Sequence, residues 1–151
     1  MYFRGNFDHA LDAKHRLTIP SRFRGEFAAG IVMVPSLALE EDQASTVQIW
    51  TPAAFDAFAE SSLMGQHPLL PLTQDLNRSL FNDSFDTELD SANRVMIPTQ
   101  LMEHAGLRKD VTVTGSGSYL EVWDRGIYEA HREPTRTRMK SELAARLGHT
   151  A

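Results

Sequence analysis

The sequence of 151 residues contains no cysteine, which excludes disulfide bonds and thiolate chemistry. It has no apolar run close to the roughly 20 residues that a membrane-spanning helix needs. Residues 1–6 also lack the apolar stretch of a signal peptide. From these absences we expect a protein of the reducing cytoplasm with no membrane partner.

Basic residues are in the minority: 15 Lys and Arg stand against 20 Asp and Glu, for a net charge of −5. Taken alone, this sum argues against a nucleic-acid partner. The charges are unevenly distributed, however, because residues 1–25 hold five basic and two acidic residues, whereas residues 40–90 hold one basic and ten acidic residues. Electrostatic attraction depends on local patches, so the N-terminal part remains a candidate for binding a phosphate backbone.

One stretch of the chain occurs twice, at residues 7–20 and again at residues 85–98. Phe, Asp, Leu, Asp, Arg, Ile and Pro recur in the same register, at a constant offset of 78 residues. The likeness continues to an apolar segment that ends at Trp50 in the first copy and at Trp123 in the second. The first copy has a longer connector within residues 36–45. Self-similarity of this length indicates a duplicated structural unit.

Hydrophobic alternation and turn residues predict strands and helices in the same order in both copies. The predicted strands are 7–12, 17–19, 31–34 and 46–50, then 85–89, 94–97, 111–114 and 119–123, the last two forming a hairpin. The predicted helices are 21–29, 53–64, 72–81, 99–105 and 125–132, with a break at 65–71. Asp124 is a predicted helix cap, and Pro134 should interrupt the last helix before a marginal basic helix in the tail.

The repeated pattern Leu-Asp-x-x-x-Arg-apolar-x-Ile-Pro resembles the MraZ family, within the wider AbrB-like group. The resemblance extends to Phe3-Arg4-Gly5 and covers the chain to about residue 133. It implies an α+β fold of two tandem pseudo-symmetric AbrB/SpoVT-like halves that form a small β-barrel with flanking helices. The halves would be residues 1–64 and 85–133, with a helical connector at 65–84 and a basic C-terminal tail at 134–151.

The same resemblance implies a function. Family members are sequence-specific DNA-binding transcriptional regulators, repressors of the bacterial division and cell-wall gene cluster. They bind tandem short direct repeats in double-stranded DNA as a ring of about eight or more subunits. The resemblance thus implies no enzyme activity, no cofactor and no metal, and a nucleoid-associated protein of the cytoplasm.

The candidate DNA-binding residues are Lys14, His15, Arg16, Arg94 and Arg4. Arginine presents a planar fork of donors that suits phosphate or the O6 and N7 atoms of guanine. The family usually has glycine before the motif arginine. Here His15 and Asn93 stand there, and both residue types tolerate a positive φ, so we expect the turn to form.

Asp12 and Asp90 are the candidate orienting groups for these arginines. The residues alone leave open whether Asp12–Arg16 and Asp90–Arg94 are merely intramolecular ion pairs that close a turn. Two other functions also stay open: an oligomeric interaction protein that does not bind DNA, and a β-barrel enzyme that uses Asp12 and Asp90 as paired carboxylates. The histidines show no metal-ligand spacing.

Overall fold

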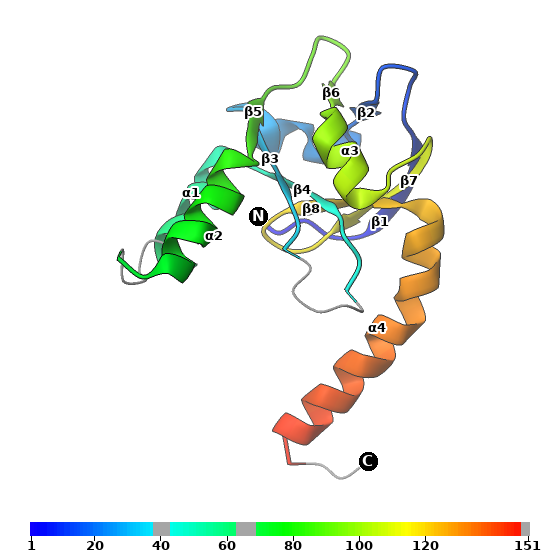
Figure 1. Cartoon of the computed structure of the whole chain (residues 1–151). Coiled ribbons are helices and arrows are strands. Elements are labelled where there is room, and N and C mark those ends of the chain that lie inside the picture. Colours follow the sequence, from blue (N-terminus) through cyan, green and yellow to red (C-terminus); the bar gives the residue numbers. More distant parts are fainter. Residues whose placement is uncertain (38–42, 63–68, 149–151) are drawn as a thin grey trace.

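The computed structural model describes residues 1–37, 43–62 and 69–148 (Figure 1). Half of the predicted 36–45 connector and most of the predicted break at 65–71 lie outside these ranges, as does the end of predicted helix 53–64. The fold is mixed α+β, with a six-stranded antiparallel sheet, a separate two-stranded sheet and flanking helices. None of the helices in the described ranges is long and apolar enough to cross a membrane.

The predicted order of strands and helices is confirmed. Their ends differ from the predicted ones by at most two residues, except that the last helix ends fourteen residues later than predicted. The strands are β1 (Asn6–Ala10), β2 (Arg16–Thr18), β3 (Ile31–Pro35), β4 (Val47–Trp50), β5 (Phe85–Thr87), β6 (Arg94–Met96), β7 (Asp110–Gly115) and β8 (Leu120–Asp124). The helices are the 3-10 helix η1 (Ser21–Phe27) and α1 (Pro52–Ser62), α2 (Pro71–Asn82), α3 (Thr99–Ala105) and α4 (Arg125–Arg146).

The large sheet interleaves the two sequence copies. Its strand order is β1-β7-β8-β4-β3-β5, so the first strand of each copy pairs with the third strand of the other. At the centre β4 pairs with its own counterpart, β8, with Val47 opposite Val122 and Ile49 opposite Leu120. The sheet therefore reads the same from either edge when equivalent strands of the two copies are exchanged.

The small sheet, which we call the ribbon, consists of β2 and β6 and has the same symmetry. Leu17 lies opposite Val95, its equivalent in the second copy. Residues 19 and 97 extend the pairing, because the Ile19 N–H donates to the Asn93 carbonyl at 3.1 Å and the Ile97 N–H donates to the His15 carbonyl at 2.9 Å. The ribbon thus joins the two motif copies side by side.

No closed barrel forms among the strands that the structure describes. The six-stranded sheet is open, with β1 and β5 at its edges, and the ribbon is a second sheet. The predicted small β-barrel is therefore not found. The reason is the partner choice of β2 and β6, which hydrogen-bond to each other and not to the edges of the large sheet.

The core lies on both faces of the large sheet. One face packs against the ribbon, η1 and α3 through a cluster that includes Phe23, Phe27, Leu17, Val95 and Leu101. The other face carries a smaller cluster with α1 and α2, centred on Trp50. Its ring lies 5.7 Å from the Phe55 ring and 4.7 Å from the Tyr119 ring, which confirms that Trp50 is a core residue. Trp123, also predicted to be core, is half-buried.

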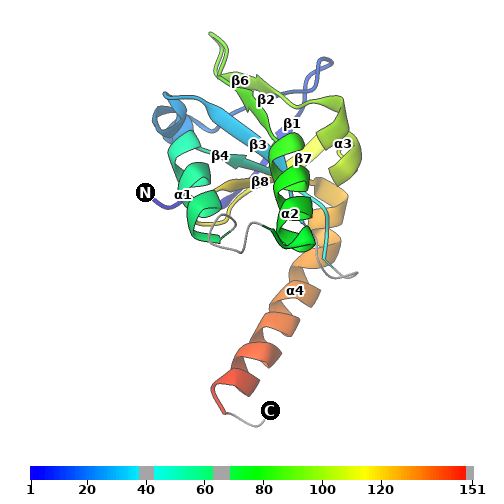
Figure 2. The ribbon, with the colours of Figure 1, turned by 60° about the vertical axis from the view of Figure 1, so that its left-hand side comes forward.

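Helix α4 differs from its prediction. Asp124 caps it, as predicted, by accepting the Ile127 N–H at 3.1 Å. The predicted interruption at Pro134 is wrong, because the helix continues through Pro134 to Arg146. Proline removes one helical N–H, but the helix here is exposed, so water is available to the freed carbonyl. Figures 1 and 2 show the second half of α4 running away from the sheet.

Candidate nucleic-acid interface

The first motif copy folds into a tight turn, residues 12–16, that precedes β2. One carboxylate oxygen of Asp12 accepts the backbone N–H groups of Lys14 and Arg16, each at 2.9 Å. The other oxygen accepts the Arg16 Nε–H at 2.6 Å. A single aspartate therefore both closes the turn and fixes the guanidinium at its end.

The second motif copy forms the same turn with residues 90–94. Asp90 accepts the backbone N–H groups of Ala92 at 2.8 Å and Arg94 at 2.9 Å, and it accepts the Arg94 Nε–H at 3.1 Å. The two turns differ in charge, because Ala92 stands where the first turn has the exposed Lys14.

Both turns need a residue in the left-handed region directly before the arginine. His15 has φ 57° and Asn93 has φ 60°. These are the positions where the family usually has glycine, and the expectation that His and Asn would support the turn is confirmed. Asparagine and histidine are among the side chains that tolerate this conformation best.

The aspartates are held in their ionised form. Hydrogen bonds from the Arg16 backbone N–H first, and then from its side chain and the Lys14 N–H, lower the pKa of Asp12 despite some desolvation. The pKa of Asp90 is lowered in the same way, first by the Arg94 backbone N–H. Both carboxylates thus serve their turns as acceptors, and neither has the raised pKa of a general acid.

The ion pairs left open by the sequence are present, but they occupy only part of each guanidinium. Arg16 uses Nε toward Asp12, and no other described residue accepts a hydrogen bond from its Nη groups. Arg94 is more constrained, because its Nη1 also lies 3.8 Å from Asp12. The Arg16 side chain remains 29% exposed and that of Arg94 32% exposed, so both reach solvent.

The outward face of the ribbon collects these arginines. Leu17 and Val95 are buried beneath it. Strand alternation therefore turns the neighbouring residues outward: Arg16 beside Met96, and Thr18 beside Arg94. Diagonal neighbours on such a pair lie roughly 7–8 Å apart, so the two guanidinium groups share one small surface.

The sequence analysis did not single out Thr18 or Met96, which are both exposed. The signal was their alternation with the buried Leu17 and Val95, which places them on the same face as the motif arginines. The outward face of the ribbon, Arg16, Thr18, Arg94 and Met96, together with Lys14 in the adjoining turn, is named the tip below.

Arg4 does not join the tip. It precedes β1, and the Gly115 N–H donates to the carbonyl of neighbouring Gly5 at 2.8 Å. In the β1–β7 register, Asn6 pairs with Thr114 at this end and Ala10 pairs with Asp110 at the end that leads into the first turn. Arg4 and Asp12 lie eight positions apart along mostly extended chain, a distance on the order of 25 Å.

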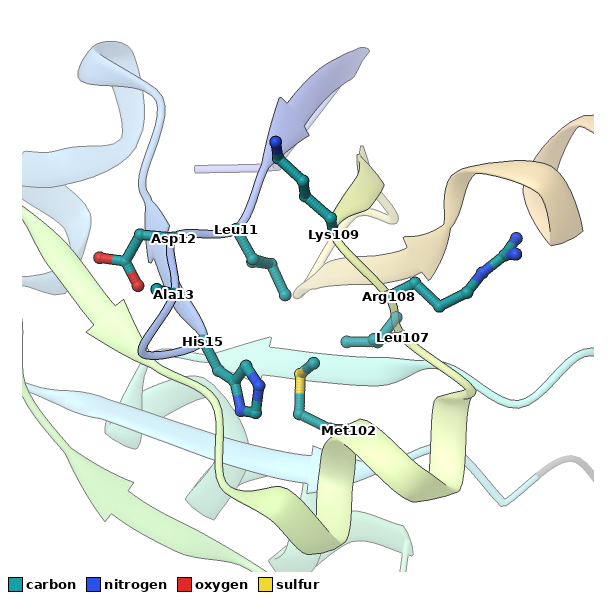
Figure 3. Close-up of a pocket in the computed structure, with 8 residues that line it drawn as sticks. All are labelled: Leu11, Asp12, Ala13, His15, Met102, Leu107, Arg108 and Lys109. Carbon is teal, nitrogen blue, oxygen red and sulfur yellow. The ribbon is translucent and has the colours of Figure 1, made fainter.

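A cavity of about 570 Å³ lies beside the first turn (Figure 3). Its lining residues are Leu11, Asp12, Ala13, His15, Met102, Leu107, Arg108 and Lys109. In Figure 3 the His15 imidazole points toward Met102, whereas the Asp12 carboxylate points the other way. His15 therefore lines the cavity beside the tip. Among the described residues, no group of three or more His, Asp or Glu side chains is placed to hold a metal ion.

Comparison with known proteins supplies the family. A regulator from Mycoplasmoides gallisepticum, named Transcriptional regulator MraZ, is 32% identical over 131 residues, which are 87% of this chain and 87% of that protein. The chain belongs to the MraZ family. A family model described as "MraZ protein, putative antitoxin-like" matches residues 80–147, the second motif copy and α4.

Two further MraZ relatives match nearly the whole chain. The Mesoplasma florum protein is 29% identical over 140 residues, 93% of this chain and 92% of its own. The Nitrosomonas europaea protein is 28% identical over 145 residues, 96% of each. Both are named Transcriptional regulator MraZ. The resemblance found in the sequence is thereby confirmed, and the named activity of these relatives is regulation and not enzymatic catalysis.

Proposed function

We propose that this protein is a sequence-specific DNA-binding transcriptional regulator. Following the family resemblance, it would repress the bacterial division and cell-wall gene cluster by binding tandem short direct repeats as a ring of about eight or more subunits. Its two motif copies would be AbrB-like halves of one DNA-binding unit. The observation that carries the proposal is the tip, where two turns of the same backbone shape hold Arg16 and Arg94 on one outward face.

The tip suits DNA in both shape and charge. The major groove of B-DNA is wide enough, at roughly 12 Å, for a two-stranded β-ribbon. Three basic side chains reach solvent at the tip: Lys14, Arg16 and Arg94. They outnumber the two turn carboxylates, Asp12 and Asp90. Because the carboxylates accept the backbone N–H groups and Nε, the Nη groups of Arg16 are left to bind phosphate or a guanine edge.

One tip offers few contacts, so a single subunit would bind weakly. Linking several tips in one assembly converts later binding events into intramolecular ones and raises affinity by roughly 10²–10⁴. Binding through several tips would therefore allow a chain of net charge −5 to hold DNA. The acidic parts of the chain would not oppose binding, since only the tips would face the double helix. Arg4, at the far end of β1, would make a separate contact.

The test is a mobility-shift titration with the DNA directly upstream of the protein's own coding sequence, over a series of salt concentrations. Wild type should form a shifted complex that weakens as salt rises. The Arg16→Ala/Arg94→Ala variant should lose the complex while keeping the wild-type particle size. Arg78→Ala, which removes an exposed arginine on α2, is the matched control and should bind normally.

Two results would overturn the proposal. Tight binding by the Arg16→Ala/Arg94→Ala variant would mean that the tip is not the DNA contact. Absence of any shift by wild type at low salt would favour the oligomeric interaction protein that does not bind DNA.

A further inference from the structure

The second half of α4 carries an exposed apolar row. Met139, Leu143 and Leu147 recur every four residues, so they lie on one face of the helix. Their exposed fractions are 50%, 51% and 64%. The first turn of α4 packs on the sheet, where the Tyr128 ring lies 5.4 Å from the Trp123 ring. Exposed apolar side chains in such a row mark an interaction surface.

A basic row runs beside the apolar row on the same helix. Arg132, Arg136 and Lys140 are again spaced by four residues and are all exposed. From Pro134 to the end of the described helix, four basic residues stand against one acid, Glu142. Arg136 forms an exposed ion pair with Glu133 at 3.5 Å, which is weak enough to exchange for another partner. A partner for this face therefore needs leucine-like side chains and carboxylates.

The helical hairpin α1–α2 offers that combination. Leu69, Leu70 and Leu72 are 76%, 50% and 69% exposed at the start of α2. Asp75 and Asp83 follow on the helix face that begins with Leu72, since positions 72, 75, 79 and 83 lie on one side of a helix. In the described parts of the hairpin four acids, Asp56, Glu60, Asp75 and Asp83, stand against Arg78 alone.

The two surfaces lie on different sides of the subunit. In Figure 1 the hairpin flanks one side of the sheet, and the second half of α4 projects beyond another. We propose that α4 of one subunit docks on the α1–α2 hairpin of a second copy of this chain, with Met139, Leu143 and Leu147 against the exposed leucines and the basic row against Asp75 and Asp83. This inference deepens the proposed function, because it assigns the contact that would build the ring.

Charge decides between this contact and a symmetric one. Two α4 helices packed together would bring two basic rows into contact, and two hairpins would bring two acidic faces together; like charges across an interface are unfavourable. The contact of α4 with the hairpin is complementary and heterologous. A heterologous contact repeats from subunit to subunit and closes into a ring when the rotation allows it.

Charge reversal in the full-length chain tests the contact, with particle mass measured by light scattering after size-exclusion chromatography. Arg136→Glu/Lys140→Glu should reduce the assembly to single subunits of 16.9 kDa, and so should Asp75→Lys/Asp83→Lys. An equimolar mixture of these two variants should assemble again, because each α4 then meets a hairpin of opposite charge. All four positions are exposed, so circular dichroism should show unchanged folding.

The control is Arg16→Ala/Arg94→Ala, which should keep the wild-type mass, so that a failure of DNA binding and a failure of assembly are seen separately. The inference is overturned if wild type is a single subunit, or if either charge-reversed variant keeps the wild-type mass. It is also overturned if the mixture stays dissociated. Unchanged mass with lost DNA affinity in the α4 variant would show instead that α4 contacts DNA.

Discussion

The two motif turns have nearly the same backbone and different surroundings. In both, one aspartate accepts two backbone N–H groups and an Nε–H, and the residue before the arginine has φ near 60°. Only the first turn carries a lysine, and only the second arginine lies near both aspartates. The comparison indicates that Asp and Arg preserve the shape of the turn, while the neighbouring positions determine how strongly each copy attracts DNA.

The largest effect, a loss of folding stability, should come from substituting the buried pair of the ribbon, Leu17 and Val95. Leu17→Ala should lower the free energy of unfolding by about 2–5 kcal/mol, because it leaves a cavity between the ribbon and the core. Val95→Ala should cost less, because valine has a smaller side chain than leucine and leaves a smaller cavity. Urea denaturation followed by circular dichroism measures both. The exposed neighbour Thr18→Ala should change stability by less than about 0.5 kcal/mol, and an equal cost at residues 17 and 18 would contradict this account.

The two motif arginines, Arg16 and Arg94, should contribute unequally to the DNA affinity of the protein. Arg16→Ala should weaken binding by about tenfold or more, the value of a good bidentate contact. Arg94→Ala should weaken it less, because Asp12 and Asp90 both lie near its guanidinium. Fluorescence anisotropy with labelled operator DNA measures the two affinities. A larger loss at Arg94 would reverse the comparison.

The two aspartates should destabilise the fold at low pH. Their pKa values are lowered in the folded state, so the unfolded chain binds more protons in acid. The stability that they contribute is present above their ordinary pKa of 3.8 and should be lost as pH falls through the lower folded values. Melting temperatures from pH 6 to pH 2 should fall less steeply for Asp12→Asn/Asp90→Asn than for wild type. Some slope should remain, because the pKa of Asp124 is also lowered, first by its hydrogen bond from Arg108.

The smallest effect on DNA binding should come from the position where the two turns differ in charge, Lys14 in the first and Ala92 in the second. Lys14→Ala should reduce the slope of log affinity against log salt by about 0.9, the value of one phosphate contact, and Ala92→Lys should increase it by a similar amount. Anisotropy titrations at several salt concentrations give the slopes. An unchanged slope for both variants would mean that neither position faces phosphate.

Local features of the fold were predictable from the sequence. Helix α3 has the predicted bounds, residues 99–105, since Pro98 and Gly106 mark its ends chemically. The β7–β8 hairpin was predictable because the short Gly- and Ser-rich segment 115–118 forms a tight turn between two apolar strands. The prediction that Pro134 would interrupt the last helix was wrong. Proline is unfavourable inside a helix because it lacks the N–H of one helical hydrogen bond, but α4 is exposed at this point, so water can bond the freed carbonyl.

Long-range features were less accessible. Hydrophobic periodicity predicts which residues face the core, but it does not predict which strands pair with each other. The open sheet and the separate ribbon could therefore not be predicted from the sequence. For the site, the repeat identified Asp12, Arg16 and their equivalents. The repeat did not predict that Arg4 lies at the opposite end of β1, or that the His15 side chain points toward Met102. Both positions depend on contacts with residues distant in sequence.

The interleaved strand order also governs when the chain can fold. The Thr112 hydroxyl donates to Asp8 across 104 residues, and among the strands that the structure describes β1 pairs only with β7. While the ribosome is still making the first copy, β1 and β2 have no strands to pair with. The sheet can therefore close only late in synthesis, and long-range pairing of this kind makes folding slow. A truncated chain that ends before β6 would expose unpaired strand edges, the hallmark of an aggregation-prone product.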